Sequence, residues 1–209
     1  MRRIRLFLLV LCFFCGVGVI TVNAATPGEP VCSLPEEEIR AFIEELDIEL
    51  LDHDDRKTSI LSFDVREDGT VALAVGGGMI YVYDPSGEYQ YGFRIDSNGD
   101  YGIEFQGDML AIYFARSYYI ALFDDTGKCI DVQQIVDPNQ RLARTREVLV
   151  RTTRETAGKS YILERDIEVG AGYSRLVAVD ASGGRTVLYD VTTDHVIGQV
   201  LMIAGILGF

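Results

Sequence analysis

"MIYVYDPSGEYQYGF", residues 79–93, is the stretch that decides the fold, because two later stretches have the same layout. YIALFDDTGKCIDVQ covers residues 119–133, and RLVAVDASGGRTVLY covers residues 175–189. Each consists of an apolar run, an Asp-x-x-Gly motif and a second run. An Asp side chain can bond the backbone two residues on, and Gly supplies the positive φ that closes a hairpin. The three stretches therefore predict three strand–turn–strand units.

The first two units repeat with a spacing of 40 residues, from Asp84 to Asp124 (124 − 84). The same offset aligns five further pairs: Asp68 with Asp108, Ile80 with Ile120, Tyr83 with Phe123, Gly87 with Gly127, and Ile95 with Ile135. The third motif, at Asp180, comes 56 residues later (180 − 124), and we assign the extra length to an additional hairpin within residues 138–158. These offsets predict copies at about 59–96, 99–136 and 160–191, within a β domain of residues 58–191.

Two segments of the copies indicate strands that are covered on both faces. In DGTVALAV (residues 68–75) and DMLAIYF (residues 108–114), nearly all side chains are apolar or small, which is typical of such strands. Three glycines, Gly76 to Gly78, follow the first of these segments, and Arg116-Ser117 takes their place in the second copy. We interpret the glycines as a permissive turn rather than a phosphate-binding loop, because no helical pattern follows them.

The pattern DGTVALA…IYVYDPSGEYQYGF resembles the four-stranded blades of β-propellers, in which an Asp-x-x-Gly hairpin joins the outer strands. The resemblance covers residues 59–136 well and residues 160–191 loosely, and a period near ~40 fits blade repeats. Closed propellers have ~4–8 blades, whereas the sequence has three copies. The resemblance therefore implies a blade-like β-meander, or an incomplete ring that a partner or other parts of the chain would close.

The order of features also resembles a family of exported, membrane-associated proteins of Gram-positive bacteria, and this resemblance implies no activity. It rests on a signal, a short acidic helix, the SFDVREDG and YGIEF…IYFARS segments, and an apolar tail. The fold class that we predict is mainly β. It is an antiparallel β-meander of blade-like, partial propeller-like repeats, with one N-terminal amphipathic helix and hydrophobic helices at both termini.

The amphipathic helix is predicted over residues 33–50. Ser33 and Glu36 form a capping-box pattern, and an apolar stripe follows at helical spacing, made by Ile39, Phe42, Ile43 and Leu46. We interpret the stripe as the contact of the helix with the sheet, where it covers an edge. A helix that binds a partner is the alternative.

Both ends of the chain are hydrophobic. Residues 1–24 have three arginines and then an apolar run of 17 residues, from Leu6 to Val22 (22 − 6 + 1), which predicts a signal peptide or an uncleaved signal-anchor. The tail, residues 195–209, is apolar or glycine from Val196 to Phe209 except at Gln199. We predict that it is a helix buried in lipid as a short anchor, with a strand packed into the domain as the alternative. The domain is then exported and held at or near the cell membrane.

Charge and cysteine content narrow the class of partner. Without residues 1–24 the chain has 16 basic residues (19 − 3) and 32 acidic residues, a net charge of −16. This balance argues against binding to nucleic acid, whose phosphates require Lys and Arg. Two cysteines remain, Cys32 and Cys129, and a disulfide between them is an open alternative outside the cytoplasm.

Two acidic clusters suggest metal ligands and have simpler interpretations. The first is Asp52-His53-Asp54-Asp55, whose four consecutive side chains cannot all point at one ion; we interpret it as a solvated linker. The second offers oxygens in the order Asp96, Asn98, Asp100 and Glu104, which departs from the EF-hand order. We interpret it as a turn between copies, with calcium as the alternative. No metal site and no cofactor is assigned.

A basic segment stands out in this acidic chain. RLARTREVLVRTTRETAGK contains six cations, Arg141, Arg144, Arg146, Arg151, Arg154 and Lys159. We interpret it as a basic hairpin that pairs with the acidic remainder of the domain. The alternative is a site for an acidic or phosphorylated ligand, because guanidinium groups pair bidentately with carboxylate and phosphate.

The function that the sequence favours is a non-catalytic binding or interaction module that takes a protein or glycan ligand. Neither His53 nor His195 adjoins a Ser or Cys nucleophile motif, and no residue is assigned a catalytic role. The alternatives are a propeller-like hydrolase and a structural subunit of an envelope assembly. An oligomer is compatible with the binding module and with both alternatives.

Overall fold

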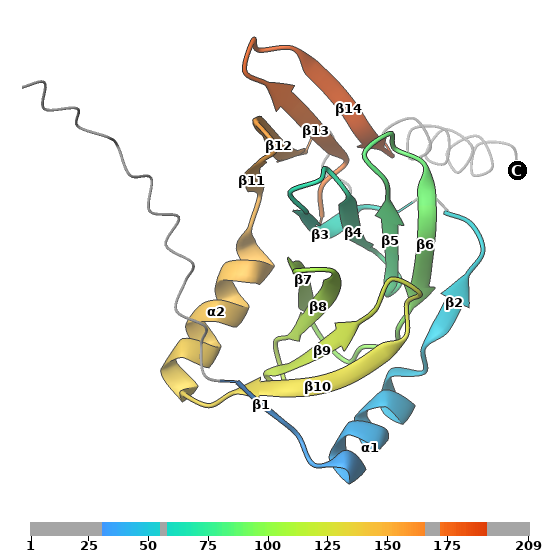
Figure 1. Ribbon diagram of the computed structural model, residues 1–209, viewed down its shortest axis with the longest axis vertical. Helices are drawn as coiled ribbons and strands as arrows, with labels where there is room; N and C mark the ends of the chain where they lie inside the picture. The colour runs from blue at the N-terminus through green and yellow to red at the C-terminus, as the bar shows by residue number, and fades with distance from the viewer. Residues whose placement is uncertain (1–30, 55–57, 166–171, 192–209) are drawn as a thin grey trace, which may run out of the picture.

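The computed structural model describes residues 31–54, 58–165 and 172–191. Both predicted hydrophobic ends, residues 1–24 and 195–209, lie outside these ranges. Within them, no helix is long and apolar enough to cross a membrane. The described residues form three antiparallel sheets and two helices (Figure 1), so the mainly β class is confirmed.

We call the sheets blades 1, 2 and 3. Blade 1 has the order β2-β6-β5-β4-β3, with bounds Glu49–Leu51, Tyr89–Arg94, Met79–Tyr83, Val71–Val75 and Ile60–Val65. Blade 2 has the order β1-β10-β9-β8-β7, with bounds Val31–Ser33, Cys129–Ile135, Tyr119–Phe123, Met109–Phe114 and Tyr101–Gln106. Blade 3 has the order β11-β12-β13-β14, with bounds Thr153–Thr156, Lys159–Glu164, Arg175–Asp180 and Arg185–Asp190. Blade 3 thus begins before residue 160, where the third copy was predicted to start.

The three Asp-x-x-Gly turns have the same hydrogen bonds, as the repeat predicts. Asp84 Oδ1 accepts from the backbone N–H and the hydroxyl of Ser86, at 2.8 and 2.6 Å, and from the N–H of Glu88 at 3.0 Å. Asp124 and Asp180 accept the corresponding three bonds in their own turns. The predicted equivalence of Asp84 and Asp124 is confirmed, and Asp180 shares it.

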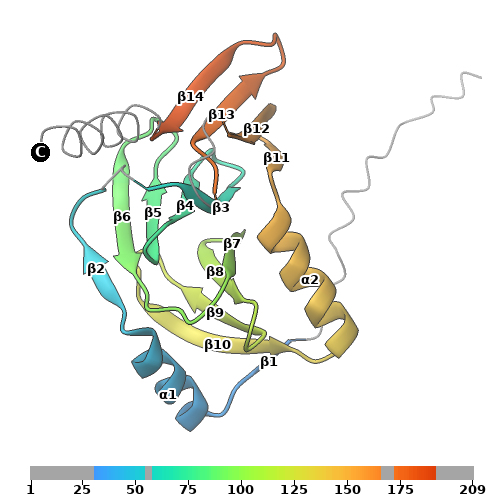
Figure 2. The ribbon, with the colours of Figure 1, turned by 180° about the vertical axis from the view of Figure 1, so that it is seen from behind.

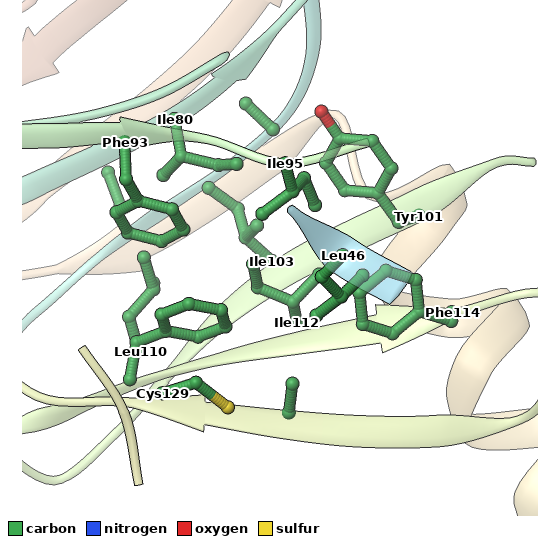
Figure 3. Packing of buried hydrophobic residues seen from close by; sticks show 14 of the residues in the cluster. Leu46, Ile80, Phe93, Ile95, Tyr101, Ile103, Leu110, Ile112, Phe114 and Cys129 are labelled. Atoms are coloured by element: carbon green, nitrogen blue, oxygen red, sulfur yellow. The ribbon is translucent and has the colours of Figure 1, made fainter. Parts of the chain in front are cut away.

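Blade 1 lies between the other two blades. One apolar cluster joins blade 1 to blade 2 (Figure 3), and in it the rings of Phe93 and Phe123 stack with centroids 4.4 Å apart. A second cluster joins the opposite face of blade 1 to blade 3 and contains Tyr81 and Tyr189. Every residue of β4 is buried, which confirms that this strand is covered on both faces.

The helix α2 (Pro138–Val150) corrects the prediction of a hairpin within residues 138–158. Asp137 caps the helix by accepting from the N–H groups of Asn139 and Gln140, and Pro138 takes the first helical position, where it needs no N–H. Within residues 138–158, strand structure begins only at Thr153. Figures 1 and 2 show α2 beside blade 2 and ahead of blade 3, and Val148 packs with apolar residues of blade 2.

The helix α1 (Glu36–Leu46) is shorter than the predicted range, residues 33–50. The capping box is wrong: Ser33 belongs to β1 and its hydroxyl donates to Asp131 at 2.9 Å, while Pro35 takes the N-cap position. The apolar stripe does pack against the cluster between blades 1 and 2, and the Phe42 ring contacts Phe114 edge-on at 5.2 Å. The interpretation of α1 as a cover for the sheets is therefore confirmed.

The segments on either side of α1 each add a fifth strand to a blade. β1 pairs with β10 at the edge of blade 2, and β2 pairs with β6 at the edge of blade 1. The three-glycine segment is a turn between β4 and β5, with positive φ at Gly77 and Gly78. The N-terminal part of the chain thus covers the outer edges of two of the three blades.

Candidate functional site

Three ionisable residues occupy equivalent positions on β3, β7 and β11, which we call the inner strands of blades 1, 2 and 3. The position is found from the strand registers. In each blade, the residue before the turn aspartate pairs with a residue of the next strand, and that residue pairs in turn with one on the inner strand: Val65, Phe105 and Glu155. One residue earlier on those strands stand Asp64 in β3, Glu104 in β7 and Arg154 in β11. The repeat therefore places one charged side chain at the same position of each of these three strands.

These residues belong to a group that we call the ionic centre: Asp64, Glu104, Arg144, Glu147, Arg151 and Arg154. Arg151 bridges the two blades, with Nη2 2.8 Å from Glu104 Oε1 and Nη1 3.4 Å from Asp64 Oδ1. Arg154 Nε lies 3.1 Å from the same oxygen of Asp64, and Arg144 pairs with Glu104 Oε2. The centre thus balances three guanidinium groups against three carboxylates.

Both carboxylates at the core of the ionic centre are buried and fully used. The Asp64 side chain has no exposed surface and that of Glu104 is 7% exposed. The second oxygen of Asp64 accepts from the N–H of Phe105 at 2.8 Å, and Tyr113 donates to Glu104 at 3.3 Å. A general acid or base needs an oxygen that can reach the reacting group. Neither carboxylate offers one.

Burial sets the electrostatics of the centre. It raises the pKa of Asp64 above its usual range, against the opposing effects of the Phe105 N–H, Arg154 and Arg151. Burial also acts to raise the pKa of Glu147, but Arg144 and Arg151 outweigh it and leave that pKa below its ordinary value. Burial, helped by the nearby charge of Glu104, raises the pKa of Tyr113 to about 12, so its hydroxyl stays protonated and donates.

The basic segment behaves as the internal-pairing interpretation expects. Arg144, Arg151 and Arg154 all pair within the ionic centre, and Arg141 Nε donates to the carbonyl oxygen of Ile135 at 2.9 Å. The interpretation is confirmed for these residues, although Arg141 and Arg144 lie on a helix rather than a hairpin. The two core carboxylates were not singled out as a pair from the sequence. The 40-residue offset relates them (104 − 64) and could have indicated it.

The acidic clusters do not converge on a metal. Glu104 pairs with Arg144 and Arg151, whereas Asp96, Asn98 and Asp100 lie in the loop before β7. In the linker, His53 Nδ1 lies 2.6 Å from Asp52, and Tyr83 donates to Asp54 at 2.8 Å. Asp55 lies outside the described residues. Among the described residues, no three His, Cys, Asp or Glu side chains could hold a metal ion together.

The disulfide alternative is wrong in this structure. Cys32 and Cys129 are both free, the first exposed and the second buried. Cys32 on β1 is opposite Gln134 of β10, whereas Cys129 begins that strand and is opposite Phe123. Burial raises the pKa of the Cys129 thiol to about 11, so that thiol is protonated and unreactive at neutral pH.

An open groove lies beside the ionic centre, at the end where the inner hairpins turn. It has two connected parts of about 510 and 340 Å³, which share Arg66, Phe105 and Asp108. Arg66 stands over the Phe105 ring at 5.6 Å, with Asp68 2.6 Å and Asp108 3.7 Å from its guanidinium nitrogens. Arg154 of the ionic centre lines the first part, and Tyr91 and Asp125 line the second. We call this surface the central groove.

No protein-family model and no curated protein matches the chain. Solved structures do match at low identity. A streptogramin B lyase is 13% identical over 69% of this chain and 45% of its own, with a TM-score of 0.33. A virginiamycin B lyase from Staphylococcus aureus is 11% identical over 68% and 59%, also with a TM-score of 0.33. The WD40 repeats of RRP9 are 11% identical over 75% and 43%, with a TM-score of 0.30.

These neighbours are β-repeat proteins of the propeller type. This chain spans less than two thirds of each of them. The propeller-like character of the repeats rests on the strand registers and the shared turns described above. The likeness says nothing about activity.

Proposed function

We propose that this protein is an exported, membrane-tethered β-repeat module that binds a protein or glycan ligand and has no catalytic role. The observation that carries the proposal is the state of the two converging carboxylates. Hydrolysis by a carboxylate pair needs two carboxyl groups that reach the substrate, and Asp64 and Glu104 are the pair that the ionic centre brings together. Both are buried, and arginines and hydrogen-bond donors occupy all four of their oxygens.

The central groove is the surface that we propose for the ligand. It combines aromatic side chains with charges of both signs, and it is held between rigid sheets, where recognition surfaces are commonly placed. Acidic residues outnumber basic ones on its walls, which fits a ligand rich in hydroxyl groups or positive charge better than an anionic one. A subunit role in an envelope assembly would use the same groove for a protein neighbour.

The tether is proposed from the sequence. The apolar run from Leu6 to Val22 and the apolar tail from Val196 to Phe209 are the segments that would hold the module at the membrane. The mature domain is strongly acidic, so the proposed attachment is hydrophobic rather than electrostatic.

Capture from the native envelope tests the proposal. The full-length protein is cross-linked in its own cells and purified, and the bound material is identified. The same is done with Asp108→Lys, which reverses a fully exposed charge on the groove, and with Glu44→Lys, an exposed position on α1. We expect one partner that is retained by Glu44→Lys and lost by Asp108→Lys. A partner retained by both variants would place binding elsewhere, and release of a chemically altered ligand would favour the hydrolase.

A further inference from the structure

Blades 1 and 3 are joined at one end and separate at the other. At the joined end, Ile60 and Tyr173 exchange two backbone hydrogen bonds of 2.8 Å, and the Tyr189 hydroxyl donates to the carbonyl oxygen of Thr58 at 3.3 Å. At the other end, between the Asp84 turn and the start of β12, the sheets leave a cavity of about 160 Å³. This cavity is distinct from the central groove and shares only Asp84 with it.

The walls of the cavity are mainly apolar and aromatic. Blade 1 contributes Leu73 and Tyr83, and blade 3 contributes Tyr161, Leu176 and Ala178. An apolar cavity of ~150 Å³ accommodates a benzene molecule, so the available volume suits one six-membered ring. Aromatic walls favour such a ring, because their edges and faces pair with it in offset or T-shaped contacts.

Two polar groups of the cavity have no partner among the described residues. The Tyr83 hydroxyl is used by Asp54 and that of Tyr189 by Thr58. Tyr161 is only 4% exposed and makes no hydrogen bond to any described residue. Burial raises the pKa of Tyr161, so its hydroxyl is a donor at neutral pH. Its hydroxyl oxygen is not among the fully buried polar atoms that lack a partner, so water reaches it, and an acceptor atom of a ligand can take the place of that water.

Lys159 is the second polar group, and it brings a positive charge to the cavity. In the described structure it has no carboxylate within ion-pairing distance. Asp180 is opposite Lys159 in the strand pair and Asp84 lines the same cavity. Oδ1 of each already accepts three hydrogen bonds within its own turn. A hydroxyl donor and an ammonium group beside an apolar cavity together match a carboxylate attached to a ring.

We propose that the cavity between blades 1 and 3 binds a small aromatic carboxylate. The ring enters between the two sheets, and the carboxylate accepts hydrogen bonds from Tyr161 and Lys159. This site lies outside the central groove and does not depend on the function proposed for that groove. Its test therefore succeeds or fails independently of the envelope partner.

The test uses 4-fluorobenzoate with the purified full-length protein, and fluorine NMR of the ligand gives the Kd. We expect saturable binding to the native protein. Tyr161→Phe and Lys159→Gln should each weaken it about tenfold, because each removes one hydrogen bond to a charged group. Lys128→Gln is the matched control, since it removes one positive charge near the Asp124 turn, outside the cavity, and should bind as the native protein does.

Two cavity-filling variants keep the proposal testable if one of them folds poorly. Ala178→Leu fills the cavity from blade 3 and Leu73→Phe fills it from blade 1. Loss of binding in a variant that melts no lower than the native protein supports the site, and unchanged binding in both overturns it. Equal affinity for 4-fluorobenzyl alcohol, with no effect of Lys159→Gln, would overturn the carboxylate assignment.

Discussion

Among the described glycines, Gly78 leaves the least room for a Cβ. Its φ is +77°, and a Cβ there would lie 2.1 Å from the carbonyl oxygen of Ile95. The N–H of Ile95 also donates to the carbonyl oxygen of Gly78 at 2.9 Å. This contact ties the turn between β4 and β5 to the segment that leaves blade 1 for blade 2.

Gly78→Ala is therefore expected to destabilise the protein more than an alanine at another positive-φ glycine. Gly87 is the matched control, with φ +86° and no neighbouring atom within 4 Å of the position that a Cβ would take. Gly87→Ala should cost about 1–2 kcal/mol of unfolding free energy, the cost of a left-handed L-residue, and Gly78→Ala should cost clearly more. Urea unfolding of both variants measures the difference. Equal losses of unfolding free energy would show that the turn at Gly78 shifts to make room for the Cβ.

Arg151 is the residue that joins the two core carboxylates of the ionic centre, and its side chain is only 10% exposed. Arg151→Ala should lower the unfolding free energy by roughly 3–5 kcal/mol, because it leaves the buried Glu104 Oε1 without a partner and leaves Asp64 Oδ1 with Arg154 alone. Arg146→Ala, at an exposed position of the same helix, should change it by less than about 0.5 kcal/mol. Reversal of Arg151 and Arg154 to Glu should destabilise further. Native melting of these variants would instead favour an anion-binding site.

At the scale of the elements, the three turns form a repeated acid-sensitive unit. Hydrogen bonds from the hydroxyls of Ser86, Thr126 and Ser182, followed by backbone N–H groups, hold the pKa of Asp84, Asp124 and Asp180 below the usual range. A carboxyl whose folded pKa is depressed stabilises the fold above its unfolded pKa of ~3.9, and this contribution is lost as the pH falls through the folded value. The raised pKa of Asp64 acts in the opposite direction, because ionisation of this carboxyl lowers the stability of the fold as the pH rises.

The turns are thus expected to cause part of the loss of stability below about pH 4. A variant with Asn at all three turn positions should melt lower at pH 6, but its melting temperature should fall less between pH 6 and pH 3. Asp125→Asn, beside one turn, serves as the control and should follow the native curve. Parallel melting curves for the native protein and the triple variant would contradict this account.

The elements also show which parts of the fold could be predicted from the sequence. The Asp-x-x-Gly turns are set by local chemistry, so they could be predicted, and the 40-residue offset then indicated the register of the first two blades. Helix α2 was missed because the repeat spacing was extended as strands, although Asp137 and Pro138 are ordinary signals of a helix start. The three-residue strands β1 and β2 carry no periodicity of their own, because pairing with a blade edge creates them.

The candidate site was harder to predict for the same reason. Asp64 and Glu104 are related by the repeat, but Arg144 on α2 and Arg151 just after it come from outside the repeating part. Pairing across 87 residues, as between Asp64 and Arg151, depends on how blade 3 returns to blade 1. The cavity at that junction likewise depends on the packing of two sheets and has no local signal.

At the scale of the whole molecule, the three blades and α2 surround the ionic centre, and blade 3 is the C-terminal blade of the described chain. Its final described residue, Val191, is fully buried, and its N–H donates to the carbonyl oxygen of Ser174 at 3.0 Å. A chain cut after this residue therefore keeps every described contact of the domain.

Residues 25–191 should consequently fold, remain in solution and leave the membrane fraction, with a melting temperature close to that of the full chain. Two further chains, 1–191 and 25–209, show which hydrophobic end holds the protein, since each keeps one of them. We expect residues 1–191 to reach the membrane through the N-terminal run if that run is not cleaved, and residues 25–209 to associate with lipid vesicles through the tail. Fractionation, circular dichroism and vesicle flotation measure these outcomes. If residues 25–191 unfold while the full chain is stable, the tail packs into the domain as a strand, and the lipid anchor is wrong.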